Sequence, residues 1–259
     1  MSKELDTFSI VLSGGGMKCV WSAGFLVALV DMGLLPSTII TKSGNAGNAV
    51  YLATNQSESI KRIWTEHLTG NRFINWWRFW KVIDIDFLVD DVLTKKEPVN
   101  FVALKASPIK VLIACFNVTK QRIDYFSNET ITFSVLKATK AMPIVYGKEI
   151  RINDDMYTDK PFSPYQLLQD QKLNLEQKIL LIDVRDNNVL FRKLYTIVGD
   201  KTNTQEISSQ NIFVIKPEHI ELHLLSSSKV VMEKAYNEGY SFALSKKESI
   251  LEFLQKESN

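Results

Sequence analysis

Short apolar runs alternate with longer segments of helical periodicity along the chain. Strand-like runs lie at Phe8–Leu12, Ser37–Lys42, Lys110–Asn117, Arg122–Phe126, Ile179–Asp183 and Ile212–Lys216. Helical segments lie at Asn48–Ala53, Glu58–Leu68, Thr132–Thr139 and Leu173–Gln177, in a long apolar run from Val20 to Leu35, and in two amphipathic helices within Ser227–Lys256 divided at Gly239. The polar stretch Gly199–Glu206 predicts an exposed loop. This alternation predicts an α/β fold with a mostly parallel sheet and helices on both faces.

A glycine-rich turn separates the first predicted strand from the first predicted helix. Its residues are Ser13, Gly14, Gly15, Gly16, Met17 and Lys18. Such a turn leaves backbone N–H groups unobstructed at a helix N-terminus, where partial positive charge collects. It therefore predicts a site for an anion, either a bound phosphate or the oxyanion of acyl transfer. A turn that only lets strand and helix pack closely is the alternative.

The spacing of the glycines disfavours a nucleotide. A dinucleotide-binding fingerprint starting at Gly14 needs its third glycine where Cys19 stands, and an acidic residue at the end of the second strand, which ends at Lys42. A P-loop ends in Gly-Lys-Ser/Thr, whereas Gly16–Cys19 is Gly-Met-Lys-Cys. A nucleotide-binding protein is therefore the weaker alternative.

The segment Ser43–Gly47 has the shape of the nucleophile elbow of hydrolases. It joins the second strand to a helix, and small residues are needed there because strand and helix backbones nearly touch. Centring the G-x-S-x-G pattern on this segment puts Asn45 in the nucleophile position. Asn tolerates the positive φ of the apex, but a carboxamide is no acyl-transfer nucleophile. The segment thus predicts an elbow that keeps its turn and lacks its nucleophile.

Together these motifs resemble the patatin-like phospholipase family. Besides Leu12–Lys18 and the elbow, the segments similar to bacterial members are Met32–Leu34, Ile85–Leu93, Phe101–Ile109, Leu136–Pro143 and Tyr236–Ala243. The resemblance covers nearly the whole chain and implies a single three-layer α/β/α domain over residues 1–259. It also implies hydrolysis of phospholipid or other lipid acyl esters by a Ser–Asp dyad, with no metal or other cofactor.

The resemblance also assigns catalytic positions. The oxyanion turn of the family matches Gly14, Gly15, Gly16, Met17 and Lys18. The dyad base, which the family carries in a D-G-G or D-G-A motif, matches Asp159. That residue ends a predicted hairpin, Glu149–Pro161, in which Asp154 and Asp155 are expected to be ordinary turn residues.

The chain departs from the family pattern at and beside the catalytic positions. Asn45 stands for the serine, Ser43 for the first elbow glycine, and Cys19 for the glycine after the basic residue. Lys160–Pro161 replaces the glycines after Asp159, and the lysine of this pair adds a cation that favours the ionised carboxylate. These departures predict a pseudoenzyme, that is, a catalytically silent lipid-binding or regulatory protein. An active esterase is the alternative, through another nucleophile or because Asn45 is an engineered change.

Other nucleophiles fit the pattern less well. Ser43 lies two residues before the expected elbow centre, so its side chain is expected to point at the neighbouring helix. Cys19 lies near a helix N-terminus and Lys18, where a thiol pKa can be depressed, yet a lone Cys there is more often a packed small residue. The three histidines fit no triad pattern and are expected on the surface or in loops: His67, His219 and His223.

Composition narrows the expected partners and location. The chain has 259 residues, 45% of them hydrophobic, which is enough for a full core, and its net charge of +2 gives no global attraction to nucleic acid. Cys19 and Cys115 lie far apart and predict no disulfide framework. No signal peptide is expected because the first apolar run soon meets glycines, and no membrane span because Asp31 interrupts Phe25–Leu35. These features predict a cytoplasmic protein.

One aromatic segment bears on membrane contact. Phe73–Lys81 holds Trp76, Trp77 and Trp80 beside an arginine and a lysine. Trp with Arg and Lys suits a lipid–water interface, so the segment predicts an interfacial entrance and peripheral membrane contact. Burial of these aromatics beneath a loop is the alternative. We expect a mixed outcome, with one tryptophan buried and the others at the entrance.

Overall fold

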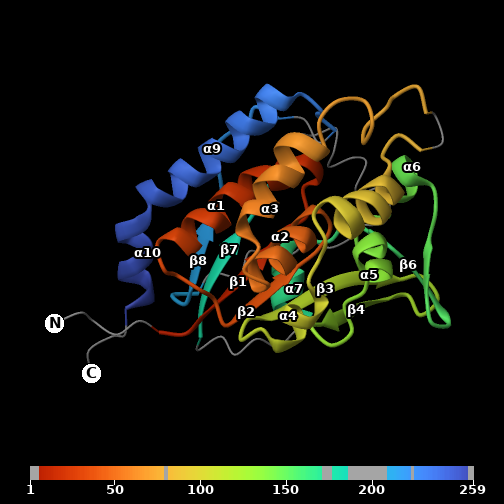
Figure 1. The fold of residues 1–259 in the computed structure, drawn as a ribbon. Helices are drawn as coiled ribbons and strands as arrows, with labels where there is room; N and C mark the ends of the chain where they lie inside the picture. Colours follow the sequence, from red (N-terminus) through yellow and green to blue (C-terminus); the bar gives the residue numbers. More distant parts are fainter. Residues whose placement is uncertain (1–5, 79–80, 171–176, 186–208, 223–224, 256–259) are drawn as a thin grey trace.

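The centre of the molecule is one eight-stranded sheet, shown in Figure 1. The computed structural model describes residues 6–78, 81–170, 177–185, 209–222 and 225–255. The strands are β1 (Phe8–Leu12), β2 (Thr38–Thr41), β3 (Lys110–Asn117), β4 (Arg122–Ser127), β5 (Ile150–Ile152), β6 (Asp155–Thr158), β7 (Lys178–Ile182) and β8 (Ile212–Ile215). Their order is β5-β6-β3-β2-β1-β7-β8, with β4 also paired to β3.

The larger part of the sheet is parallel. β1 pairs in parallel with β2 and β7, β2 with β3, and β7 with β8, while β4, β5 and β6 make the antiparallel pairs at the other edge. Ile10 stands opposite Ile39 on one side and Leu180 on the other, so β1 is the middle of the parallel part. The prediction of a mostly parallel sheet is confirmed.

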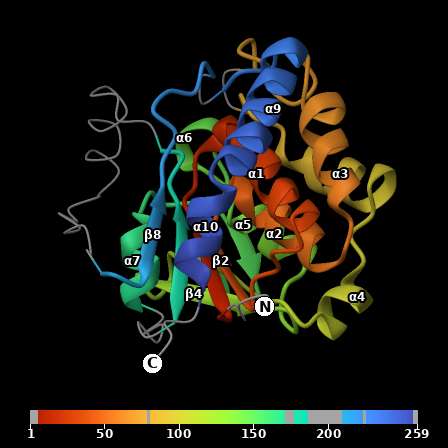
Figure 2. The same cartoon turned by 90° about the vertical axis from the view of Figure 1, so that its left-hand side faces the viewer.

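Helices cover both faces of this sheet. They are α1 (Cys19–Asp31), α2 (Gly44–Ala53), α3 (Ser57–Arg62), α4 (Phe101–Ala106), α5 (Phe133–Ala138), α6 (Pro143–Tyr146), α7 (Pro164–Asp170), α9 (Lys229–Ser245) and α10 (Lys247–Leu254), with a short 3-10 turn η1 (Gly16–Lys18). Successive β1 side chains alternate between two cores: Ile10 and Leu12 belong to the larger one, and Val11 to the smaller one, which α7 covers. Figure 2 shows α7 on one side of the sheet and α1, α2 and α9 on the other.

The C-terminal helices divide at a different residue from the one predicted. Helix α9 runs through Gly239 to Ser245, and the break comes at Lys246. Gly239 lies against α1 instead: a Cβ atom at this position would stand 2.0 Å from the carbonyl oxygen of Trp21, and one at Gly24 would stand 1.9 Å from that of Tyr236. The prediction of a break at Gly239 is wrong because this glycine serves close helix packing.

We expect Gly239→Ala to lower the free energy of unfolding by about 3 kcal/mol, because overpacking against a helix backbone outweighs the roughly 1 kcal/mol gained in helix propensity. The matched control is Gly47→Ala in α2, where an added Cβ meets no atom within 4 Å. That variant is expected to gain stability. Urea unfolding of both variants checks the pair, and a stabilising Gly239→Ala would contradict the packing argument.

Two helical segments are wound as π-helices. They are η2 (Ile63–His67), which continues α3, and η3 (Phe87–Lys96). Leu68 N donates to Ile63 O at 3.0 Å and Glu97 N to Val92 O at 2.8 Å, which is the i to i+5 spacing of a π-helix. The helix predicted at Glu58–Leu68 is therefore present in two windings, and no helix was expected at Phe87–Lys96.

Two predicted segments lie outside the described residues. They are the helix at Leu173–Gln177, apart from its last residue, and the loop at Gly199–Glu206. None of the helices in the described ranges is long and apolar enough to cross a bilayer.

Candidate active site

The strained residue between β2 and α2 is Ser43. Strand β2 ends at Thr41, α2 begins at Gly44, and Ser43 caps that helix with φ 55° and ψ −134°. A non-glycine residue at positive φ costs on the order of 1–3 kcal/mol and persists only where its surroundings enforce it. Here the N–H of Ser43 donates to Thr139 Oγ1 at 2.8 Å, which fixes the turn. Ser43 is 8% exposed and its side chain borders two cavities described below.

Asn45 lies inside helix α2, so the prediction that it forms the elbow apex is wrong. Its side chain is fully buried, and Nδ2 donates to Ser13 O at 2.8 Å and to Ser22 Oγ at 3.3 Å. Its Oδ1 accepts from Asn48 Nδ2 at 2.8 Å. Asn45 thus ties α2 to the end of β1 and to α1. The pseudoenzyme hypothesis rested on several departures from the family pattern, and it loses the support of Asn45 at the apex.

The glycine turn after β1 lies directly beside the elbow. A Cβ at Gly14 would stand 3.2 Å from Ser43 Cβ, and a Cβ at Gly44 would stand 2.9 Å from both Gly16 O and Cys19 Sγ. The N–H groups of Gly14 and Gly15 donate to no acceptor among the described residues. They are therefore available to an oxyanion formed next to Ser43.

The five residues matched to the oxyanion turn do not share one surface. Gly14, Gly15 and Gly16 line a polar cleft together with Ser43, whereas Met17 lines a neighbouring apolar cavity. Lys18 is buried and borders a different hollow, lined also by Arg185 and His219. The geometry therefore groups the three glycines with Ser43 and sets Lys18 apart from it.

Asp159 reaches the same cleft from the end of β6, as the predicted hairpin requires. Its carboxylate Oδ1 lies 2.8 Å from Lys42 Nζ, and both side chains are 5% exposed. Lys42 Nζ also donates to Lys160 O at 2.6 Å and lies 3.7 Å from the centroid of the Phe162 ring. Because one carboxylate oxygen is held by Lys42, the other remains available for a hydrogen bond from a second donor.

The cation beside Asp159 is thus Lys42 and not the predicted Lys160. Lys160 Nζ lies over the Phe116 ring, 4.4 Å from its centroid. Asp155 pairs with Lys120 at 2.6 Å near the other end of the hairpin, and the hydrogen bond from Lys120 is the main cause that lowers its pKa. The sequence did not predict the pairing of Lys42 with Asp159, because a lysine at the end of a strand is normally exposed to solvent. The structure shows no hydrogen bond between the described Ser43 and Asp159, and such contacts often tighten only on substrate binding.

Two hollows meet at Ser43. The cleft is called polar here because it contains the charged side chains of Lys42, Asp159 and Arg185; its full lining is Gly14, Gly15, Gly16, Lys42, Ser43, Met142, Asp159, Pro161, Phe162 and Arg185. The apolar cavity is lined mainly by residues of α2, α3, η2 and η3 and of the segment between these two π-helices, including Ile63, Trp64, Phe73, Ile85, Leu88 and Leu93. Gly16, Ser43 and Met142 belong to both. Ser43 therefore lies where the cleft with the charged side chains meets the apolar cavity.

None of the other nucleophile candidates among the described residues lines the polar cleft or the apolar cavity. Burial raises the pKa of the Cys19 thiol to about 12, which agrees with the favoured interpretation as a packed small residue and not with the alternative of a depressed pKa. Cys19 and Cys115 are both free thiols. His67 Nε2 lies 3.6 Å from Glu97 Oε1, His219 borders the hollow beside Lys18, and His223 lies outside the described residues.

The aromatic segment forms a small hairpin with an exposed tip. Ile74 and Ile83 form an antiparallel bridge, and between them Trp76 is 63% and Trp77 84% exposed. Burial of these two tryptophans is therefore ruled out, and Trp80 lies outside the described residues. At the base, Phe73, Ile83 and Ile85 are buried and line the apolar cavity. The same segment thus joins an exposed aromatic tip to the wall of the cavity.

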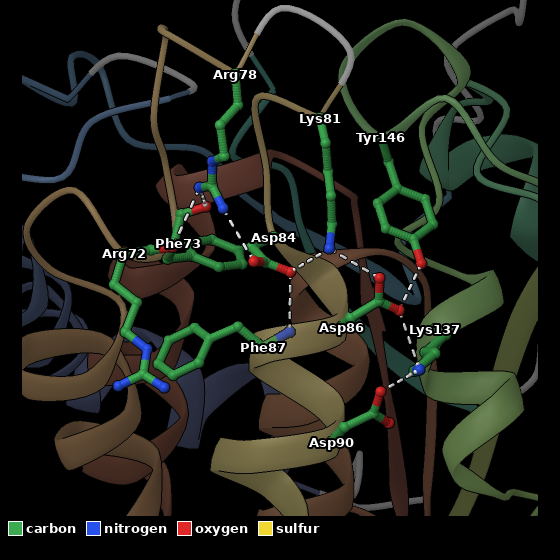
Figure 3. A network of polar contacts seen from close by, with 10 residues as sticks. All are labelled: Arg72, Phe73, Arg78, Lys81, Asp84, Asp86, Phe87, Asp90, Lys137 and Tyr146. Carbon is green, nitrogen blue, oxygen red and sulfur yellow. Dashed lines mark hydrogen bonds and ion pairs between the residues drawn. The ribbon is translucent and has the colours of Figure 1, made fainter.

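An ionic network holds the base of this hairpin, as Figure 3 shows. Lys81 Nζ lies 2.6 Å from Asp84 Oδ1 and 2.9 Å from Asp86 Oδ2, and Arg78 Nη1 lies 2.9 Å from Asp84 Oδ2. Although burial opposes the ionisation of Asp86, hydrogen bonds from Lys81, Tyr146 and Lys137 hold the pKa of its carboxyl below the usual range. The tip therefore projects from a base fixed to α5 and α6.

Comparison with known proteins shows similarity in sequence and in fold. The family model described as patatin-like phospholipase matches residues 10–159, a range that contains the glycine turn and Ser43 and ends at Asp159. The fold is similar to that of VipD from Legionella pneumophila, with a TM-score of 0.59 and 12% identity over 95% of this chain and 67% of that one. It is also similar to human GIVD cytosolic phospholipase A2 in complex with methyl gamma-linolenyl fluorophosphonate, with a TM-score of 0.53 and 12% identity over 96% of this chain and 58% of that one. No match was found among curated protein sequences.

The family match covers more than half of the chain, so the chain belongs to the patatin-like phospholipase family. The resemblance inferred from the sequence is confirmed. At 12% identity the two structural likenesses show the fold alone, and the chain spans only about two thirds of the first structure and less of the second.

Proposed function

We propose that the chain hydrolyses acyl esters of lipids with Ser43 as the nucleophile and Asp159 as its base. The observation that carries the proposal is the strained Ser43 at the junction of the polar cleft and the apolar cavity. A lipid ester has the same division, because an apolar acyl chain is joined through its carbonyl carbon to a polar alcohol. With the chain in the cavity and the alcohol in the cleft, that carbon lies at Ser43.

The proposed reaction has two halves. In the first, Asp159 accepts the proton of Ser43 Oγ while Oγ attacks the carbonyl carbon, and the resulting oxyanion accepts hydrogen bonds from the N–H groups of Gly14 and Gly15. Collapse of this intermediate breaks the ester C–O bond, and the leaving alcohol takes the proton from Asp159. In the second half, water attacks the carbonyl carbon of the acyl-serine while Asp159 accepts its proton. The bond from that carbon to Ser43 Oγ then breaks, Oγ takes the proton from Asp159, and the fatty acid is released.

The test of this proposal is ester turnover by the chain and by its Ser43→Ala variant, for which the expected result is given in the Discussion. A folded chain that binds lipid without turning it over would favour the alternative of a silent lipid-binding protein.

We also propose that the hairpin tip meets lipid at a membrane surface, as a peripheral contact made by a cytoplasmic protein. Trp76 and Trp77 are exposed side by side in the sequence, and tryptophan is favoured at the lipid–water interface. The base of the same hairpin lines the apolar cavity, which Ser43 also borders.

Replacing Trp76 and Trp77 together by serine is expected to lower co-sedimentation with phosphatidylcholine vesicles several-fold while leaving the melting temperature nearly unchanged, since both side chains are mostly exposed. The matched control is Val102→Ser, which removes an 81% exposed apolar side chain from α4. Vesicle binding by the double variant equal to that of the control would rule out the tip as the membrane contact.

A further inference from the structure

Lys140 is a cation in the wall of the apolar cavity. It follows α5, is partly buried, and lines the cavity together with Ser43, Gly44 and Met142. The preceding residue, Thr139, holds this part of the chain in place. It is fully buried, accepts a hydrogen bond from Ser43 N at 2.8 Å and donates one to Ala114 O at 3.0 Å. The lysine therefore stands at the end of the cavity that adjoins the elbow.

Few protein groups among the described residues balance the charge of the Lys140 ammonium. Nζ donates to Leu136 O at 3.2 Å, and none of the described carboxylates forms an ion pair with it. The acidic groups that face it are Asp159 beyond β6, Cys115 on β3 and Cys19 on α1. Asp159 is already paired with Lys42, and burial raises the pKa of both thiols, so they are neutral near pH 7.

An ammonium has three donors, and one backbone acceptor leaves two unused. A ligand that suits this place must have an apolar tail for the cavity and an anionic head with oxygen acceptors at the elbow end. We propose that Lys140 binds the carboxylate of a fatty acid whose alkyl chain fills the apolar cavity. The inference deepens the proposed function, since the acid released from Ser43 would have its carboxylate beside this lysine, but binding of free fatty acid requires no turnover.

The charge of Lys140 should make this binding depend on pH. Burial lowers the pKa of Lys140 to about 8, although the charge of the Asp159 carboxylate opposes this shift. A fatty acid carboxyl has the chemistry of a glutamate side chain and is ionised at pH 7. Below pH 8 the ammonium is charged and attracts the carboxylate. As the pH rises above this value the charge is lost and affinity falls, while binding itself raises the pKa of the lysine by linkage.

The experiment is calorimetric titration of the Ser43→Ala chain with dodecanoate and with dodecanol, which share a tail and differ in the head. We expect dodecanoate to bind at least about tenfold more tightly than dodecanol at pH 7, because its carboxylate gains a desolvated charged partner. Lys140→Met is expected to abolish this preference and leave dodecanol binding unchanged, since methionine keeps the apolar stem. Between pH 7 and pH 9.5 the dodecanoate affinity of the parent should fall about tenfold, and that of Lys140→Met should stay constant.

The control is Lys105→Met, which removes an exposed lysine on α4 that does not line the cavity. Unchanged dodecanoate affinity in a folded Lys140→Met variant would overturn the inference, and so would an affinity that is lost equally in the control. Ester turnover by the unaltered chain without a preference for dodecanoate over dodecanol would refute the Lys140 site and leave the proposed hydrolase intact. Tight dodecanoate binding through Lys140 without any turnover would support the site and refute the hydrolase.

Discussion

Ser43→Ala is expected to lower kcat/KM for p-nitrophenyl butyrate at least about 10³-fold while leaving the melting temperature nearly unchanged. The reason is that the variant deletes only the nucleophilic oxygen, and this oxygen accounts for none of the hydrogen bonds that fix the turn: the bond to Thr139 comes from the backbone N–H. Ester turnover and thermal unfolding of the same preparation separate the two effects.

Asn45→Ala is the matched comparison, and its effect should be the opposite. It removes the buried amide that donates to Ser13 O and Ser22 Oγ, so the free energy of unfolding should fall by about 2 kcal/mol, while kcat/KM should remain within about tenfold of the parent value. Full turnover by Ser43→Ala would refute Ser43 as nucleophile. Activity that follows position 45 instead of position 43 would restore the elbow centre inferred from the sequence.

The second large effect is expected at the Lys42–Asp159 pair. Asp159→Ala leaves the Lys42 cation buried without a counter-charge, which should cost about 3–5 kcal/mol in stability. It also removes the base, so turnover should fall by about 10²–10⁴-fold. Urea unfolding and ester turnover measure the two consequences independently.

Replacing both partners separates stability from catalysis. In the double variant Lys42→Met with Asp159→Leu neither charge of this pair remains, so most of the lost stability should return while turnover stays absent. Lys160→Met is the control, because the cation of Lys160 lies on the Phe116 ring and not on Asp159. Stability losses of equal size for Lys42→Met and Lys160→Met would contradict the assignment of Lys42 as the partner.

The sequence was sufficient to predict the strands of the sheet, but it was insufficient to predict which residue stands at the centre of the elbow. Strand β1 and the hairpin ending at Asp159 follow from local alternation and turn chemistry, which neighbouring residues determine. The G-x-S-x-G pattern places the centre of the elbow at Asn45, two residues too late, because its last glycine is matched to Gly47. In the structure Gly47 faces open space, and Gly44 is the glycine for which no side chain fits, since Gly16 O and Cys19 Sγ lie where its Cβ would be. Which glycine is sterically required depends on packing between distant segments.

The same limit explains the other differences. Gly239 resembled a helix end because glycine is a poor helix former, but its role is set by Trp21, more than two hundred residues away in the sequence. The pairing of Lys42 with Asp159, and the place of Lys140 in the cavity wall, likewise depend on long-range contacts that no local pattern contains.

The two π-helices make the shape of the apolar cavity sensitive to the number of residues in its wall. Ile63 and Trp64 of η2 and Leu88 and Leu93 of η3 line it, and π-helical turns hold an additional residue compared with α-helical ones. Deleting one residue from either segment would rewind it towards an α-helix and change which of its own side chains face the cavity. The shape of this cavity is therefore encoded in chain length as well as in residue type, so single-residue insertions and deletions, and not only substitutions, can change the space offered to the proposed acyl chain.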